Sequence, residues 1–326
     1  MRDVVIIGAG PVGIASAIEA KRRDLDALLI DKGALCNSFL GYPTNMEFFS
    51  TPERLEIGGY PFSTRSYKPI REEALDYYRR VAVAEDLDLR LYEPVTGLSG
   101  SDNDYRVQTD HGTIATRTVV LATGFYDIPN RLDVPGEDLD KVSHYYKEPY
   151  PYALTDVAII GGGNSAAKAA LACYRHDANV TLIVRDAAID DGVKYWIKPD
   201  LENRIAEGSI TAYFETTVTR IHPHRLSLNT PGGTTEIQND FVLALIGYKP
   251  NYDLIDALGI AVQDDAARTP VHDEETFETN RAGVYLAGTI CGGCNTSRWF
   301  IENGRFHAER IMDHIAERST VAVAAS

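Results

Sequence analysis

Two glycine-rich segments constrain the fold of this chain more than any other feature. The first is Gly8-Ala9-Gly10-Pro11-Val12-Gly13, and the second is Gly161-Gly162-Gly163-Asn164-Ser165-Ala166. Each follows a short apolar run that predicts a buried strand, and each opens a stretch with the apolar spacing of a helix. In such a unit the first glycine permits a sharp turn, the second lets the backbone approach a pyrophosphate, and the third lets helix and strand pack closely. Two units therefore predict two bound dinucleotides, as hydride transfer from a nicotinamide to a flavin requires.

The residues that end the second strand of each unit bear on the nucleotide. Asp31 ends the first of these strands, where a carboxylate accepts hydrogen bonds from a ribose; the alternative is a helix-capping or surface role. Arg185 follows the other strand, and a guanidinium there can hold a 2′-phosphate through two hydrogen bonds. Lys194 would add positive charge, whereas Asp186 is a contrary signal, and a solvated charge is the alternative for Arg185. The balance favours NADPH over NADH.

The order of the predicted strands and helices indicates that one domain interrupts the other. An apolar strand at 284–287 is typical of a return to the first domain. We predict an α/β fold with two Rossmann-like dinucleotide-binding domains (three-layer ββα), the second inserted into a discontinuous first domain. The first domain is predicted to span 1–124 and 251–326, and the inserted domain 125–250. Residues 319–326 are predicted to form a frayed tail.

Composition excludes several classes of partner. The chain has 326 residues, enough for two domains, and a formal net charge of −15, which disfavours a nucleic acid or an anionic membrane surface. No apolar run approaches the roughly 18–20 residues of a membrane span, and the first strand begins too early to leave room for a signal peptide. Four cysteines do not make a disulfide scaffold. We therefore expect a cytoplasmic protein.

A second feature that carries chemistry is the pair Cys291 and Cys294, separated by two glycines. This spacing is typical of a redox dithiol, and the glycines lower the steric barrier to closing the ring. A nearby helix N-terminus or flavin contacts could lower a thiol pKa toward neutrality. The alternatives are two inert buried thiols and a metal site, which no second Cys/His pair supports. Cys36 and Cys173 are predicted to be structural.

Several motifs together resemble a known group of flavoproteins. The segments Gly8–Gly13, Ala122-Thr123-Gly124 and Ala287-Gly288, with the inserted Gly161–Ala166, are similar to two-domain flavoproteins of the thioredoxin reductase type. A narrower resemblance is to the bacillithiol disulfide reductase family, and it is carried by the segments 42–44, 48–58, 134–138, 142–145 and 300–304. The resemblance implies FAD in the first domain, NADPH in the second, a homodimer, and reduction of a low-molecular-weight thiol disulfide.

The resemblance and the fingerprints together assign cofactor-binding residues. For FAD these are Gly8, Gly10, Pro11, Val12, Gly13, Asp31, Lys32, Tyr42, Thr44, Thr123, Gly124, Gly288, Thr289 and Ile290. For NADPH they are Gly161, Gly163, Asn164, Ser165, Ala166, Arg185 and Lys194.

Three departures from the related proteins bear on the electron path. The stretch 144–149 holds no cysteine, although thioredoxin reductases carry a Cys-x-x-Cys just before the second fingerprint. Val12 stands where many bacillithiol disulfide reductases have a cysteine, and Thr289 stands where the broader group has an aspartate. We therefore expect Cys291 and Cys294 to be catalytic and to have taken over the role lost at position 12.

Other functions fit parts of the same pattern. A flavin monooxygenase is one, although its Phe-x-Gly-x-x-x-His signature is absent between the fingerprints. A ferredoxin- or flavodoxin-type NADP reductase is another, but an acidic partner would be steered poorly toward an acidic chain. A non-enzyme alternative is a flavin-binding redox sensor. The leading prediction is an NADPH-dependent disulfide oxidoreductase whose acceptor is a small-molecule or protein disulfide.

Overall fold

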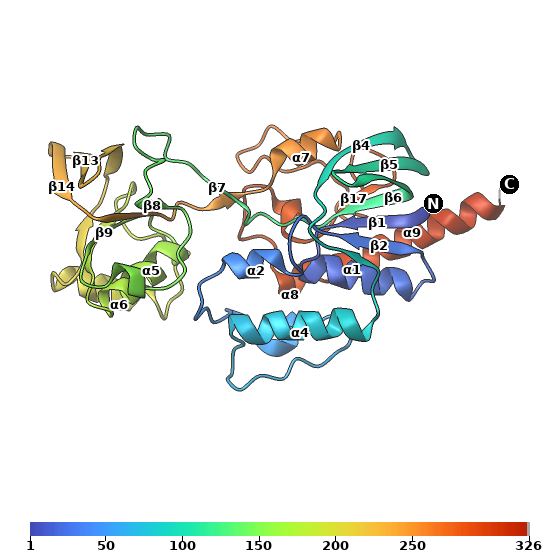
Figure 1. The fold of residues 1–326 in the computed structure, drawn as a ribbon, viewed down its shortest axis with the longest axis horizontal. Coiled ribbons are helices and arrows are strands. Elements are labelled where there is room, and N and C mark those ends of the chain that lie inside the picture. Colours follow the sequence, from blue (N-terminus) through green and yellow to red (C-terminus); the bar gives the residue numbers. More distant parts are fainter. Residues whose placement is uncertain (325–326) are drawn as a thin grey trace. The chain divides into compact units, whose positions relative to one another are not determined.

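The computed structural model describes residues 1–324, with the side chains of residues 1–318, and the chain forms two compact units (Figure 1). Unit 1 comprises residues 1–40, 46–128 and the described residues from Tyr248 onward. Unit 2 comprises residues 41–45 and 129–247. The short strands β7 (Ile128–Pro129) and β16 (Tyr248–Lys249) pair where the chain passes from one unit to the other.

Unit 1 is built on a mostly parallel sheet with the strand order β3-β2-β1-β6-β5-β4, in which β17 also pairs with β6. The strands are β1 (Arg2–Ile7), β2 (Ala27–Ile30), β3 (Leu89–Arg90), β4 (Val95–Ser101), β5 (Asp104–Thr109), β6 (Gly112–Leu121) and β17 (Val284–Leu286). Strand β1 runs parallel to β2 and β6, and β17 runs parallel to β6, whereas β4 and β5 are antiparallel additions. The carboxyl ends of the parallel strands therefore meet at one edge, where α/β sheets bind ligands.

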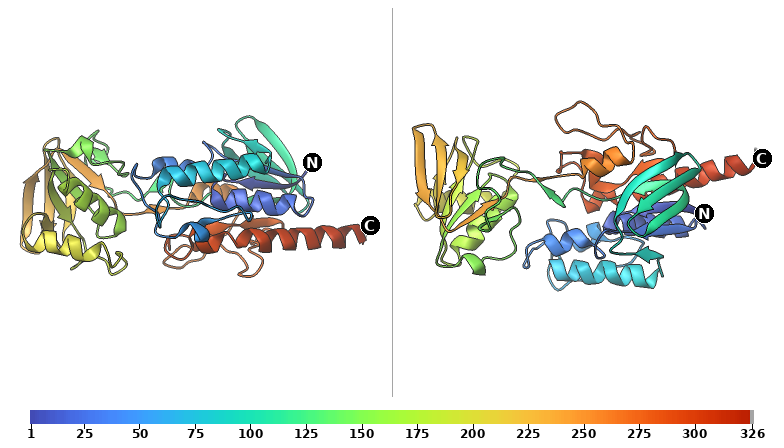
Figure 2. Two further views of the ribbon diagram at one scale, coloured as in Figure 1. Left: turned by 90° about the horizontal axis from the view of Figure 1, so that it is seen from below. Right: turned by 45° about the horizontal axis from the view of Figure 1, so that its top comes forward.

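Helices cover this sheet because its central strands are apolar on both faces. Val4, Val5 and Ile6 of β1 have no exposed surface. Helix α1 contacts both α4 and α9 (Figure 2). The helices are α1 (Pro11–Lys21), α2 (Asn37–Gly41), α3 (Pro52–Leu55), α4 (Arg71–Ala84), α7 (Tyr252–Ala257), α8 (Ile301–Gly304) and α9 (His307–Ala324), with the 3-10 turn η2 at Gly288–Gly292.

The predicted frayed tail is wrong for the residues that the structure describes. Helix α9 continues to Ala324, because the predicted tail contains an alanine- and valine-rich segment that prolongs the helix. The last two residues of that prediction lie outside the described part of the chain. Within the described part, no helix combines the length and the apolar character that crossing a membrane requires.

Unit 2 repeats the parallel design on a smaller scale. Its main sheet has the order β11-β10-β9-β15-β8, with all neighbours parallel. Its elements are β8 (Val142–Ser143), the 3-10 turn η1 (Tyr150–Tyr152), β9 (Asp156–Ile160), α5 (Asn164–Tyr174), β10 (Asn179–Ile183), α6 (Lys198–Ala206), β11 (Thr211–Tyr213), β12 (Thr217–Ile221), β13 (Arg225–Thr230), β14 (Gly233–Gln238) and β15 (Phe241–Ala244). Strands β12, β13 and β14 form a separate antiparallel sheet whose apolar face packs on the parallel one. The predicted α/β class with two Rossmann-like domains is confirmed.

Candidate functional site

The first glycine fingerprint joins β1 to α1 in a geometry that only glycine permits. Gly8 has a φ of +109°, and a side chain at Gly13 would overlap the carbonyl oxygen of Gly8. Gly10 precedes the first residue of α1, and a Cβ there would have no neighbouring atom within 4 Å. Two crowded glycines thus hold the turn, while the third faces open space at a helix N-terminus. We call this turn, residues 8–13, the first cradle. It fits a dinucleotide pyrophosphate, which accepts hydrogen bonds from unpaired backbone N–H groups.

The second fingerprint has the same construction between β9 and α5. Gly161 has a φ of +131°, and a Cβ there would lie 2.5 Å from the carbonyl oxygen of Leu245. Gly163 precedes α5 and again has no atom within 4 Å of a Cβ position. Ala166 is fully buried, where its small side chain lets the helix approach the strand. A second dinucleotide therefore fits unit 2.

Asp31 ties the end of β2 to the first fingerprint. Its carboxylate accepts hydrogen bonds from the backbone N–H of Ala9 at 2.7 Å and of Gly33 at 2.8 Å. Burial raises the pKa of Asp31, while these two hydrogen bonds oppose that rise. Lys32, the next residue, forms a 2.7 Å ion pair with Asp127. The carboxylate predicted to meet a ribose thus also fixes the backbone next to Gly10.

The segments after β6 and β17 converge on α1. A Cβ at Gly288 would lie 3.1 Å from Cγ2 of Val12, and one at Gly124 would lie 3.5 Å from Oγ1 of Thr289. Thr123 lies between the end of β6 and Gly124, and Ile290 is fully buried in η2. Val12 therefore lies against the turn that leads to the cysteine pair.

Two of the residues predicted to contact FAD belong to unit 2 and not to unit 1. Tyr42 and Thr44 group with unit 2, and the backbone N–H of Thr44 donates to the carbonyl of Lys147 at 2.9 Å. The other residues assigned to FAD belong to unit 1. Their contact with FAD stays a prediction.

Asn164 braces a loop against the second fingerprint. Its side chain donates to the carbonyl of Gly192 at 3.0 Å and accepts from the backbone N–H of Lys194 at 3.1 Å. The side chain of Arg185 is 81% exposed, and its Nε lies 3.8 Å from a carboxylate oxygen of Asp186. The fingerprint thus places Lys194 through a side-chain amide, a role that the spacing of the glycines did not predict.

The two paired cysteines lie in different environments. Cys291 is fully buried in η2, whereas Cys294 is exposed, and both are free thiols. Burial raises the pKa of Cys291, so the expected fall toward neutrality is wrong for this thiol. Cys36 and Cys173 are buried too, and burial raises the pKa of Cys173 to about 12. Of the four cysteines, only Cys294 combines exposure with a free sulfur.

His307 was not predicted from the sequence, although it adjoins Cys291. Its Nδ1 accepts a hydrogen bond from the backbone N–H of Gly288 at 3.2 Å and lies 3.7 Å from Sγ of Cys291. The imidazole stacks on Phe277 with a centroid separation of 3.9 Å and meets Trp299 edge-on at 4.4 Å. Burial lowers the pKa of His307 to about 3, so it is neutral at physiological pH.

Replacing His307 with asparagine is expected to flatten the acid dependence of stability. Because the pKa of His307 is about 3 in the folded chain and about 6.5 when unfolded, the unfolded chain binds more protons between these values. The contribution of the neutral His307 to the free energy of unfolding is therefore fully present above about pH 6.5. It decreases as the pH falls toward 3, by up to about 1.4 kcal/mol per pH unit. Urea unfolding of H307N between pH 5 and 7 should show the smaller slope. An unchanged slope, equal to that of the exposed control H224N, would contradict this assignment.

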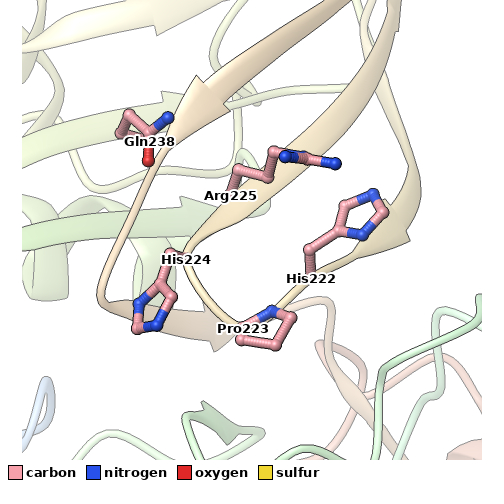
Figure 3. Close-up of a pocket in the computed structure, with 5 residues that line it drawn as sticks. All are labelled: His222, Pro223, His224, Arg225 and Gln238. Carbon is pink, nitrogen blue, oxygen red and sulfur yellow. The ribbon is translucent and has the colours of Figure 1, made fainter.

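A surface hollow in unit 2 involves none of the predicted site residues. It is lined by the turn between β12 and β13 and by the end of β14, and Figure 3 shows His222 and His224 on opposite sides of Pro223. His222 contacts the hydroxyl of Ser227 at 3.2 Å, and Arg225 pairs with Glu236 at 3.2 Å. These contacts join the turn to strands β13 and β14, so the hollow is explained by the structure of the antiparallel sheet.

Comparison with known proteins finds a family model and close relatives that match nearly the whole chain. The model of the pyridine nucleotide-disulphide oxidoreductase family matches residues 5–288. The chain is 41% identical over 318 residues to bacilliredoxin reductase Bdr of Bacillus subtilis, covering 96% of this chain and 97% of that protein. Structures of bacillithiol disulfide reductase Bdr (YpdA) from Bacillus cereus and Staphylococcus aureus are similar at a TM-score of 0.94 each, with 38% and 37% identity. They cover 97% of this chain and 99% and 98% of their own lengths.

Proposed function

Because this chain belongs to the pyridine nucleotide-disulphide oxidoreductase family, we propose that it uses NADPH and FAD to reduce a low-molecular-weight thiol disulfide of the bacillithiol disulfide kind. The observation that carries this proposal is the pair of equivalent cradles, open at Gly10 and Gly163, together with a cysteine pair that follows the last strand of unit 1. One nucleotide in each cradle accounts for both fingerprints.

Unit 1 would hold FAD, and unit 2 would hold NADPH. Asp31 lies beside the first cradle, where its free lone pairs suit the ribose hydroxyls of FAD. Arg185 and Lys194 supply positive charge next to the second, which suits the 2′-phosphate of NADPH. As the resemblance implies, we also propose that the enzyme works as a cytoplasmic homodimer.

Within the pair, Cys294 would attack the disulfide because it is the exposed thiol. Its thiolate forms a bond to one substrate sulfur and releases the other half as a thiolate. Cys291 then bonds to Cys294 and releases the second half, leaving a Cys291–Cys294 disulfide. When bound, FAD supplies the two electrons, taken from NADPH as a hydride, that return the pair to two thiols.

The position of Val12 supports this assignment. The cysteine of many related reductases would stand at this residue, and Val12 lies against Gly288, three residues before Cys291. The two sequence positions therefore lie at the same edge of the sheet. A redox thiol lost from α1 can be replaced from the segment after β17 without moving the electron path to another part of unit 1.

The proposal is tested by NADPH oxidation with a panel of symmetrical low-molecular-weight disulfides. We expect disulfide-dependent turnover, with a kcat/KM for NADPH at least about tenfold above that for NADH, since a charge-assisted phosphate contact contributes about 1.5–3 kcal/mol. The Arg185→Leu variant should lose most of this preference, and Arg225→Leu should keep it. Faster reduction of ferredoxin than of any disulfide, or peroxide release equal to NADPH consumption, would reject disulfide reduction.

A further inference from the structure

The exposed thiol of Cys294 belongs to a small cluster of side chains that contains no residue of either glycine fingerprint. Its Sγ lies 3.4 Å from the hydroxyl oxygen of Tyr252, the first residue of α7. The Tyr252 hydroxyl also donates to the carbonyl of Arg268 at 2.9 Å, and the backbone N–H of Cys294 donates to the carbonyl of Ala267 at 2.6 Å. Three segments that are distant in sequence thus fix the position of this sulfur.

A positive charge without a carboxylate partner lies in the same cluster. The guanidinium carbon of Arg268 lies 4.2 Å from the ring centroid of Tyr252. In the part of the chain that the structure describes, Arg268 forms no ion pair, whereas Arg298, close in sequence to Cys294, is paired with Glu274 at 3.1 Å. In a chain with a net charge of −15, an unpaired guanidinium that stacks on the same tyrosine that an exposed thiol contacts is suited to bind an anion.

We propose that Cys294, Tyr252 and Arg268 form the acceptor site, and that it takes a disulfide bearing a carboxylate. Arg268 would bind the carboxylate, and Tyr252 would position both the guanidinium, through its ring, and the sulfur, through its hydroxyl. The identity of Cys294 as the attacking thiol rests on the function proposed above. The balance of the step is unchanged: the Cys294–sulfur bond forms, the substrate disulfide breaks, and the released thiolate takes a proton from water.

The Tyr252 hydroxyl can serve both states of the sulfur. Burial raises the pKa of Tyr252, so the hydroxyl keeps its proton. When Cys294 is a thiol, the single hydroxyl hydrogen goes to the carbonyl of Arg268 and the oxygen accepts from the sulfur. When Cys294 is a thiolate, the same hydrogen can turn to the sulfur at 3.4 Å, which stabilises the attacking form.

The site is tested by alkylating the holoenzyme at a fixed pH with iodoacetate, an anion, and with neutral iodoacetamide. The rate at Cys294 is followed by mass spectrometry, since the other three cysteines are buried. We expect Arg268→Gln to lower the iodoacetate-to-iodoacetamide rate ratio about threefold, as loss of an exposed ion pair implies. Arg225→Gln removes the same charge from unit 2 and should leave the ratio unchanged. An unchanged ratio in Arg268→Gln overturns the anion site.

Two variants of Tyr252 separate its ring from its hydroxyl. Tyr252→Phe keeps the ring under Arg268 and should keep the ratio, while both rates fall because the thiolate loses a donor. Tyr252→Leu removes the ring and should lower the ratio as Arg268→Gln does. Equal behaviour of the two variants would overturn the positioning role. Because alkylation needs no turnover, it tests this site even if no disulfide is reduced.

Turnover provides an independent measure. With 3,3′-dithiodipropionate, a dianion, Arg268→Gln should raise KM about threefold and leave kcat unchanged. With neutral 2-hydroxyethyl disulfide, KM should not change. An equal rise for both disulfides would contradict recognition of a carboxylate.

Discussion

The variant in which serine replaces both Cys291 and Cys294 is expected to lose disulfide reduction by at least about 100-fold while its flavin is still reduced by NADPH. Serine cannot form the mixed disulfide that carries the substrate, but neither residue belongs to the two nucleotide cradles. Steady-state NADPH oxidation with disulfide measures the first effect. The absorbance of the flavin after rapid mixing with NADPH measures the second.

Single variants and a control sharpen this result. Cys294→Ser should lose the attack itself, whereas Cys291→Ser should leave Cys294 able to form a mixed disulfide that accumulates and can be detected by mass spectrometry. Cys173→Ala, at a buried thiol in α5, is the control and should retain activity. Full activity of the double variant would show that the bound disulfide receives electrons without this pair, and the flavoenzyme assignment would stand.

Restoring a cysteine at position 12 offers a gain of function. Val12→Cys in the double serine variant should recover part of the disulfide reduction, because residue 12 lies against Gly288 at the same sheet edge. Cysteine is smaller than valine, so the substitution does not crowd α1. Val12→Ala is the matched variant without a thiol and should recover nothing. Equal activities of the two would show that position 12 has no redox role here.

A second large effect is expected when alanine replaces Gly13 or Gly10, two glycines of the first fingerprint. Gly13→Ala places a methyl group on the carbonyl oxygen of Gly8, and because that atom belongs to the backbone it cannot move cheaply. We expect a loss of at least about 3 kcal/mol in the free energy of unfolding, together with loss of FAD. Urea unfolding and the flavin content of the purified protein measure the two effects.

Gly10→Ala should behave in the opposite way. Its φ is −80°, and no atom lies within 4 Å of the new methyl group, so the flavin-free protein should keep its stability within about 0.5 kcal/mol. The methyl group instead occupies the open cradle, and FAD affinity should fall at least about tenfold, equal to about 1.4 kcal/mol. Equal FAD affinity in Gly10→Ala and the unchanged protein would show that the pyrophosphate lies elsewhere.

The elements that the sequence predicts well are those set by local patterns. Strand β2 begins and ends where its apolar run does, and Pro11 and Gly163 mark the starts of α1 and α5 because proline and open glycines favour helix N-termini. The end of α9 was wrong, since a weakly apolar segment gives no local signal of whether a helix continues. The sequence also gives no local signal that residues 41–45 group with unit 2, because this grouping involves tertiary contacts such as the hydrogen bond from Thr44 to Lys147.

By itself, the sequence determined the fold class of this protein: an α/β chain with two Rossmann-like units, each opening with a glycine fingerprint. The roles of Asp31 and Arg185 in recognising nucleotides stay predictions. Glycine spacing and apolar runs act over a few residues, so they can be recognised without the fold. Only the tertiary structure decided that Cys291 is buried against His307 while Cys294 is exposed beside Tyr252 and Arg268. Burial and unpaired charge arise from contacts between segments that lie far apart in the chain, and no local pattern encodes them.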